Sequence, residues 1–143
     1  MTKNDNRTTG GRFEQELAVM LHANDFWVHV LQQNKAGQPA DIIAIRGKFH
    51  TLIDCKVCES GVFPFERVEE NQRLAMKTFF NKAGELSYFA LKLPDGKIRM
   101  IPYTRIETLK NRGKNRLSKE DIEKETWDLA NWLECSETWA EDT

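Results

Sequence analysis

Residues 41–57, with the sequence DIIAIRGKFHTLIDCKV, constrain the fold of this chain more than any other segment. Two runs rich in aliphatic residues flank the short segment RGKF at 46–49, which fits a two-residue turn. A type II′ turn prefers glycine at its first central position, and Gly47 occupies that position. The segment therefore predicts a β-hairpin, whose register places Asp41 directly opposite Asp54.

Strand alternation places Asp41, Asp54 and Lys56 on one face of this hairpin. Both faces are otherwise largely apolar, so we expect other elements to cover the hairpin on each side. Two opposed carboxylates repel each other, and apolar surroundings increase the cost unless a positive charge compensates. A divalent cation would supply that charge, whereas the alternative is a pair of solvated acids at the strand ends.

Apolar periodicity and turn residues divide the rest of the chain into further elements. The order of these elements is α-β-β-β-α-β-β-α, which is typical of an α/β (α+β) domain. We expect helices at 12–24, 66–84 and 117–134, and strands at 26–32, 41–45, 49–57, 87–93 and 97–103.

Charge is unevenly distributed, although the net charge of the 143-residue chain is only −1. Residues 117–143 hold two lysines and nine acidic residues, a balance of −7, whereas residues 1–116 hold 19 basic and 13 acidic residues, a balance of +6. A basic body is compatible with a nucleic-acid partner. The sequence shows no run of about 18 apolar residues and no apolar signal core, so we expect a cytoplasmic protein that does not bind membranes.

The three cysteines predict neither a disulfide framework nor a zinc site. Cys55 and Cys58 have CxxC spacing, but no second pair of ligands follows at short distance, as a zinc site would require. We expect Cys55, Cys58 and Cys135 to be reduced thiols.

The charged residues of the hairpin suit the hydrolysis of a phosphodiester bond. Mg²⁺ binds through one or two carboxylates and retains several waters, and Asp41 and Asp54 could provide these carboxylates. Lys56 could position a water or stabilise developing negative charge.

Two further polar residues are candidates for the same site. Glu14 lies beside the apolar stripe of the first helix, with Glu16 nearly as close on the other side, and each could equally be a surface acid. Gln72 lies within the apolar stripe of the second helix, where a buried glutamine satisfied by the backbone is the alternative.

The segments GRFEQEL, PADIIAI and IDCK, in this order, resemble the PD-(D/E)xK nuclease superfamily. Within it, FPFERVEENQ and IRMIPYTRI resemble RecU-type Holliday junction resolvases, so that the resemblance covers about residues 11–106. RecU-type proteins carry a long stalk segment before the motif aspartate, whereas only about ten residues separate the preceding strand from Asp41 here. Archaeal-type resolvases also lack that stalk.

The resemblance implies a restriction-endonuclease-like αβββαβ core, with a central mixed sheet flanked by helices, and a homodimer with two active sites. It divides the chain into a disordered N-terminus at 1–10, a nuclease domain at 11–109, a basic loop at 110–117, and an extra acidic C-terminal helix at 118–143. We expect this last helix to pack on the body or on a dimer mate.

The resemblance also assigns roles at the site. It implies that Asp41, Asp54 and the main-chain carbonyl of Cys55 bind Mg²⁺, for which Mn²⁺ would substitute. Lys56 would orient or activate the attacking water. The supporting residues would be Glu14, as an additional ligand or through a metal-bound water, and Gln72, which would support the site or contact the scissile strand.

The sequence thus predicts a Mg²⁺-dependent DNA endonuclease, a Holliday junction resolvase of recombination and repair from a bacterium or a phage. Two alternatives remain open: a nuclease for flap, branched or linear duplex DNA, and a catalytically silent DNA-binding module on the same fold. The basic residues expected to contact DNA phosphates are Lys35, Lys110, Arg112, Lys114 and Arg116.

Overall fold

The computed structural model describes residues 3–32 and 38–141, and in the first helix it describes side chains from Gly11 onward. The strands are β1 (Trp27–Val30), β2 (Ile42–Arg46), β3 (Phe49–Val57), β4 (Phe63–Pro64), β5 (Tyr88–Lys92), β6 (Ile98–Pro102), β7 (Arg116–Leu117) and β8 (Trp127–Asp128). The helices are α1 (Lys3–Ala23), α2 (Glu70–Ala83), α3 (Tyr103–Asn111), α4 (Lys119–Glu125) and α5 (Leu129–Glu141), with a 3-10 helix η1 at Phe65–Arg67.

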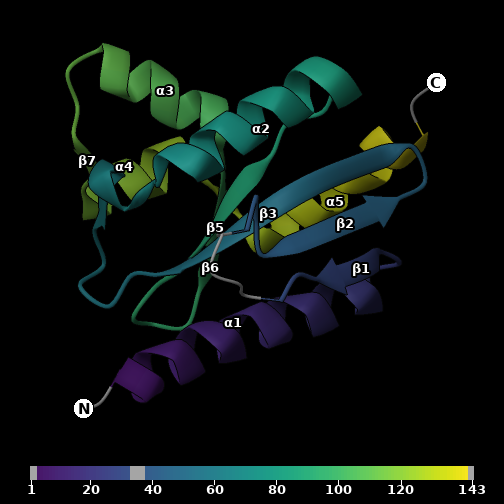
Figure 1. Cartoon of the computed structure of the whole chain (residues 1–143), viewed down its shortest axis with the longest axis horizontal. Helices are drawn as coiled ribbons and strands as arrows, with labels where there is room; N and C mark the ends of the chain where they lie inside the picture. Colours follow the sequence, from purple (N-terminus) through teal and green to yellow (C-terminus); the bar gives the residue numbers. More distant parts are fainter. Residues whose placement is uncertain (1–2, 33–37, 142–143) are drawn as a thin grey trace.

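A six-stranded sheet with the order β1-β2-β3-β5-β6-β8 forms the centre of the fold (Figure 1). β3 and β5 run parallel, whereas the other neighbouring strands of this sheet are antiparallel. The predicted αβββαβ core and mixed central sheet are therefore confirmed. The short strands β4 and β7 form a separate two-stranded sheet.

Helices cover both faces of the central sheet, and alternation along β5 shows how the core is divided. Tyr88 and Ala90 belong to a buried cluster with residues of α1 and α5, whereas Phe89 and Leu91 belong to a second cluster with residues of α2, α3 and α4. Figure 1 shows α2 and α3 on the opposite side of the sheet from α1. Because both faces of β5 are covered, both sets of its side chains are apolar.

The β2–β3 hairpin forms with the predicted turn, and Arg46 pairs with Phe49. Gly47 has a φ of +54°, as the first central position of a type II′ turn requires. The turn also lies against α5, because a Cβ atom at Gly47 would be 2.8 Å from the main-chain oxygen of Ala140. Glycine is therefore required here both for its conformation and for lack of space.

The second half of the chain differs from the prediction in two places. No helix was predicted at 103–111, where Tyr103 was expected to end a strand and Lys110 to begin a basic loop. The structure has α3 there, with Ile106 and Leu109 buried against the sheet. The single C-terminal helix predicted for 118–143 is interrupted between α4 and α5. There, Arg99 donates hydrogen bonds to the hydroxyl and main-chain oxygens of Thr126, and Trp127 pairs with Met100 as part of β8. The strand pairing holds this short segment extended, which helix periodicity alone does not reveal.

Two element boundaries also differ from the prediction. α1 begins at Lys3, not near Arg12, so most of the segment expected to be disordered is helical. α2 begins at Glu70, after η1, because Glu69 is extended and caps the helix.

None of the helices within the described residues is long and apolar enough to cross a membrane.

Candidate active site

Asp41 lies immediately before β2, where the hairpin ladder ends. The predicted direct pairing of Asp41 with Asp54 is wrong, because the last paired residues are Ile42 and Ile53. The chain bends at Asp41, its main-chain N–H donates to the Ile53 oxygen at 3.0 Å, and its carboxylate Oδ2 accepts a hydrogen bond from the Cys55 N–H at 2.7 Å. The Asp41 side chain thus reaches across the end of β3 rather than standing opposite Asp54.

Asp54, Lys56 and Gln72 form a closed triangle of polar contacts. The Gln72 amide nitrogen donates to Asp54 Oδ1 at 2.9 Å, and Lys56 Nζ lies 3.1 Å from Asp54 Oδ2. Lys56 Nζ also donates to Gln72 Oε1 at 3.3 Å. The Asp54 side chain is almost fully buried, so these contacts take the place of water around its charge.

The local structure explains why these three residues meet. Asp54 and Lys56 are two residues apart on β3, so both point toward the face that α2 covers. Gln72 is the third residue of α2, and its side chain turns back toward the start of the helix, where it accepts a hydrogen bond from the Glu69 N–H at 3.2 Å. Glu69 and Gln72 form a capping box, although glutamate replaces the serine or threonine usual at the N-cap.

Glu14 approaches from α1, on the other face of the sheet, and meets Asp41. Burial, the charge of Asp41 and a hydrogen bond with Asp41 raise the pKa of Glu14 to about 7. Glu16, the alternative candidate, is paired with Lys92 instead, whose Nζ donates to the Glu16 carboxylate at 2.7 Å. The structure therefore selects Glu14 as the acid of α1 that faces the site.

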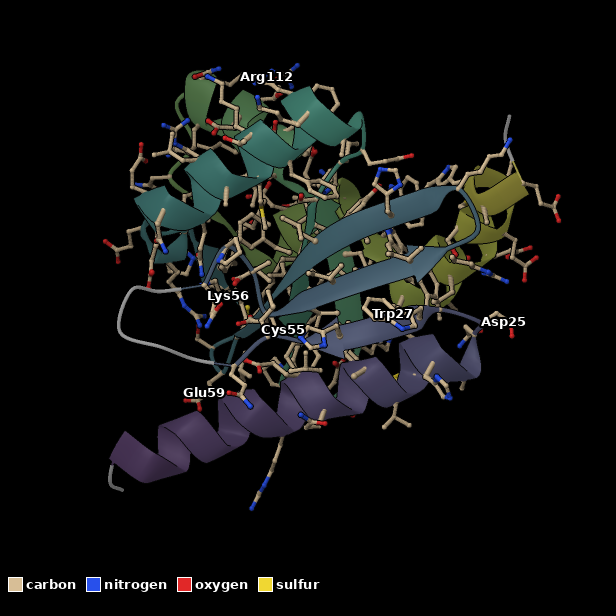
Figure 2. The ribbon with its side chains drawn as sticks, turned by 45° about the vertical axis from the view of Figure 1, so that its right-hand side comes forward. Asp25, Trp27, Cys55, Lys56, Glu59 and Arg112 are labelled. Atoms are coloured by element: carbon tan, nitrogen blue, oxygen red, sulfur yellow. The ribbon has the colours of Figure 1, made fainter. Side chains whose placement is uncertain are left out.

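Burial also dominates the ionisation of Asp54. It raises the pKa of Asp54 to about 7, with a further increase from Asp41, and the nearby Lys56 ammonium only partly opposes this shift. Burial raises the pKa of the Cys55 thiol well above its ordinary value, so this side chain is a neutral thiol. Figure 2 shows Cys55 and Lys56 at the end of β3, between α1 and α2.

These carboxylates fit a hard divalent cation. Asp54 Oδ2 is buried, and its neighbours among the described residues are the Lys56 ammonium at 3.1 Å and the Asp41 carboxyl group. A carboxylate oxygen has more than one lone pair, so it can coordinate a metal beside these contacts. No group of three or more His, Cys, Asp or Glu side chains forms a metal cage among the described residues, but Mg²⁺ needs only one or two carboxylates and completes its shell with waters. The main-chain carbonyl of Cys55 is the other candidate ligand from β3.

The predicted DNA-contacting residues do not form one uniform surface. Lys110, Lys114 and Arg116 line a groove of about 490 Å³ between η1 and β7, whose other walls include Pro64 and Phe65. We call it the basic groove. Lys114 is partly neutralised there, because its Nζ donates to the Asp121 carboxylate at 2.8 Å.

The two remaining basic candidates lie outside the basic groove. Arg112 ends α3 and lies far from Lys56, on the other side of α2 (Figure 2). Lys35 falls outside the described residues.

A sequence profile of the archaeal Holliday junction resolvases, Hjc, matches residues 5–139. The chain belongs to this family. Membership confirms the predicted superfamily and the predicted activity, a DNA endonuclease of the Holliday junction resolvase class. The Hjc family is described as archaeal, which fits poorly with the bacterial or phage source that we expected. No curated protein matches the sequence.

The fold of the Hjc family is also recovered by structural comparison. The crystal structure of Hjc from Archaeoglobus fulgidus, described as a Holliday junction resolvase from an archaeal hyperthermophile, matches with a TM-score of 0.70. The match covers 87% of this chain and 99% of that chain at 24% sequence identity. The restriction-endonuclease-like fold is therefore confirmed, and resolvase nucleases of this fold generally use divalent metal ions.

Proposed function

We propose that this chain resolves four-way DNA junctions in the cytoplasm by Mg²⁺-dependent hydrolysis, and that it does so as a homodimer. The observation that carries the proposal is the buried Asp54 carboxylate, which Gln72 and Lys56 hold beside Asp41. A buried carboxylate with a strongly raised pKa beside a second carboxylate is typical of functional sites, and Mg²⁺ binds through one or two carboxylates.

The acidic residues would hold the ion. Asp41 and Asp54 would be direct ligands together with the Cys55 carbonyl, and Glu14 would be a further ligand or would act through a bound water. A bound Mg²⁺ neutralises charge on the phosphate oxygens and lowers the pKa of water. Mn²⁺ takes similar oxygen ligands and should substitute.

Lys56 would position the attacking water. Its ammonium is held between Asp54 and Gln72, so it stays at the mouth of the site without a large loss of side-chain entropy on substrate binding. A hydrogen bond from the Lys56 ammonium would orient the attacking water. The water oxygen would form a bond to phosphorus and lose its proton to solvent, while the bond from phosphorus to the leaving sugar oxygen breaks and that oxygen takes a proton from solvent. The Lys56 charge also stabilises the added negative charge on the phosphate in the transition state.

The basic groove would hold a more distant part of the DNA backbone. Lys110 and Arg116 both line it, and both are exposed, so their charges are available to phosphates. Such contacts fix the position of an arm without reading its sequence. Enzymes that recognise a branched shape need contacts of this kind on more than one arm.

An exposed apolar surface supports the homodimer. Trp27 and Ile45 pair across β1 and β2, and Trp27 is 59% and Ile45 38% exposed. Ile43 points to the same face, which we call the β1–β2 apolar face. Phe79 of α2 borders it through its contact with His50, the residue paired with Ile45. A second copy of this chain would cover the patch and place two sites on one junction.

Cleavage of labelled four-way junction, flap and linear duplex DNA in the presence of Mg²⁺ tests the proposal. We expect junction cleavage by the wild-type chain, none by Asp54→Asn, and none in EDTA. Preferential cleavage of flap or linear DNA would show that one of these, and not the four-way junction, is the preferred substrate. Binding of junctions with no metal-dependent cleavage of any substrate would contradict the nuclease proposal.

A further inference from the structure

The start of α2 lies directly against the residues proposed to carry the chemistry. The Gln72 carboxamide makes three hydrogen bonds there: its nitrogen donates to Asp54 at 2.9 Å, and its oxygen accepts from Lys56 at 3.3 Å and from the main-chain N–H of Glu69 at 3.2 Å. Glu69 is the N-cap of α2, and its own side chain accepts a hydrogen bond from the main chain of Gln72. The two residues therefore fix each other reciprocally.

The orientation of the Gln72 carboxamide determines whether the triangle can form. In the observed orientation, the oxygen faces two donors and the nitrogen faces a carboxylate, so every contact is favourable. A rotation of 180° would place the NH₂ group against the Lys56 ammonium and the Glu69 N–H, and the carbonyl against Asp54. Such a set of contacts would leave buried polar groups unsatisfied, at a cost of about 1–3 kcal/mol for each group.

We propose that Glu69 is a positioning residue, whose main-chain N–H holds the Gln72 carboxamide in the orientation that serves both Asp54 and Lys56. The proposal rests on the proposed function, since Asp54 and Lys56 are taken as the residues that carry the chemistry. It adds that the N-terminus of a helix, and not the side chain of Gln72 alone, sets the geometry of the Asp54–Lys56 pair. Glu69 itself is exposed and contacts neither of them in the hydrogen-bond network.

The backbone geometry allows the N–H to be removed by substitution. Glu69 has a φ of −75° and is extended, which a proline ring adopts without strain. The preceding residue, Val68, has a φ of −82° and a ψ of 109°, which lies within the extended region compatible with a following proline. Glu69→Pro therefore replaces the donor by a ring CH₂ group, which displaces the Gln72 oxygen while the main chain keeps its path, and Glu69→Ala removes only the side chain.

Single-turnover cleavage of a labelled junction, followed by steady-state kinetics, tests the proposal. Removal of a supporting hydrogen bond next to a reactive group typically lowers activity by about 10–100-fold, and we expect Glu69→Pro to lower kcat by about 10-fold or more with KM unchanged. Glu69→Ala keeps the N–H and should lose no more than about 3-fold. Glu69→Ser keeps the main-chain N–H and supplies a side chain that caps helices well. This variant should therefore match the wild type.

A matched control separates positioning from loss of stability. Ser118 and Asp121 form the same kind of capping box on α4, away from the site, so Ser118→Ala destabilises a helix start without changing Gln72. We expect this variant to lose stability but to keep the wild-type kcat. If Glu69→Pro and Glu69→Ala lower kcat equally, or if Ser118→Ala lowers it as much as Glu69→Pro, the proposal is overturned.

A measurement on the metal-free wild type does not depend on cleavage or on the folding of a variant. The ¹⁵N order parameter of the Gln72 side-chain amide should be close to that of rigid backbone, about 0.85, because three hydrogen bonds hold the group. A value below about 0.6 would show a freely rotating carboxamide and would overturn the proposal. If the wild type cleaves no DNA, the proposed function fails, whereas a lower order parameter in Glu69→Pro but not in Glu69→Ala would still show positioning by Glu69.

Discussion

The side-chain nitrogen of Gln72 donates a 2.9 Å hydrogen bond to Oδ1 of Asp54, and so joins the first turn of α2 to the middle of the central sheet. Without polar partners, a carboxylate that is almost fully buried would strongly favour its neutral form. The amide dipole and the Lys56 ammonium instead give the charged form two partners. The sheet therefore carries an acid that is costly to ionise without a metal and is ready to bind one.

The first prediction concerns stability. The pKa of Asp54 is raised to about 7 in the folded protein from an ordinary value of 3.8, so the folded state resists ionisation that the unfolded state allows. The metal-free wild type should lose stability as the pH rises from about 4 to 7. Asp54→Asn removes this loss. One pKa unit corresponds to about 1.4 kcal/mol, and the lost Lys56 ion pair offsets part of the gain, so we expect the variant to be more stable by about 1–2 kcal/mol at pH 8 in EDTA.

Urea unfolding at pH 5 and pH 8 would measure the difference. The gap between Asp54→Asn and the wild type should widen with pH, whereas Glu59→Gln, which changes an exposed acid just beyond the same strand, should show no such trend. Equal stability of Asp54→Asn and the wild type at both pH values would contradict a raised pKa for Asp54.

The second prediction concerns the pH dependence of cleavage. Asp54 and Glu14 must lose protons to bind a cation, and the pKa of each is raised to about 7 without metal. Cleavage at low Mg²⁺ should therefore increase as the pH rises through about 7. Higher Mg²⁺ should move the midpoint to lower pH, because the ion competes with protons for the same oxygens. Single-turnover rates between pH 5.5 and 8.5 at two Mg²⁺ concentrations would test this, and a midpoint independent of Mg²⁺ would argue against carboxylate ligation.

The third prediction separates the four described basic candidates. Lys110→Ala and Arg116→Ala should each weaken junction binding and lower the slope of log K against log salt by about 1, as expected for a lost phosphate contact. Lys114→Ala should have a smaller effect, since Asp121 already compensates its charge. Arg112→Ala, outside the basic groove, should also have a small effect.

Fluorescence anisotropy with a labelled junction at several salt concentrations would measure these changes. Lys97→Ala, at the β5–β6 turn, controls for the general loss of one positive charge. Equal effects of Lys97→Ala and Lys110→Ala would mean that the basic groove is not a specific contact.

The fourth prediction concerns the homodimer. Trp27→Glu, alone or with Ile45→Glu, places charge in the β1–β2 apolar face and should convert a dimer into a folded monomer. Val19→Glu is the matched control, because Val19 is 68% exposed on α1, away from this face. Sedimentation equilibrium would measure the masses. A wild type that is monomeric at all concentrations, or a Trp27→Glu variant that stays dimeric, would contradict the proposed interface.

Much of the active-site geometry could be predicted because it depends on local rules. The glycine turn fixes the hairpin register, and strand alternation brings Asp54 and Lys56 to the same face. The position of Asp41 could not be predicted in this way. Its side chain takes a hydrogen bond from the Cys55 N–H, and the resulting bend ends the ladder one residue early. A prediction from strand alternation assumes that the hairpin pairing extends to Asp41, and here it ends at Ile42.

The elements that were missed depend on tertiary contacts. The Tyr103–Asn111 segment carries a helical spacing of Tyr103, Ile106 and Leu109, but this short spacing between a predicted strand and a basic loop was not assigned to a helix. The break between α4 and α5 depends on Arg99, about 27 residues away, which holds Thr126 extended. Single-sequence patterns contain no signal for such distant partners.

The aromatic residues of α5 have a consequence for how the enzyme is made. Trp132 is completely buried between Phe26, Phe49 and Tyr88, all of which precede α5 in the chain. During synthesis, the ribosome therefore releases the hairpin long before the residue that completes its core. The nascent chain carries Asp41, Asp54 and Lys56, but the core behind their hairpin lacks Trp132 until translation reaches α5.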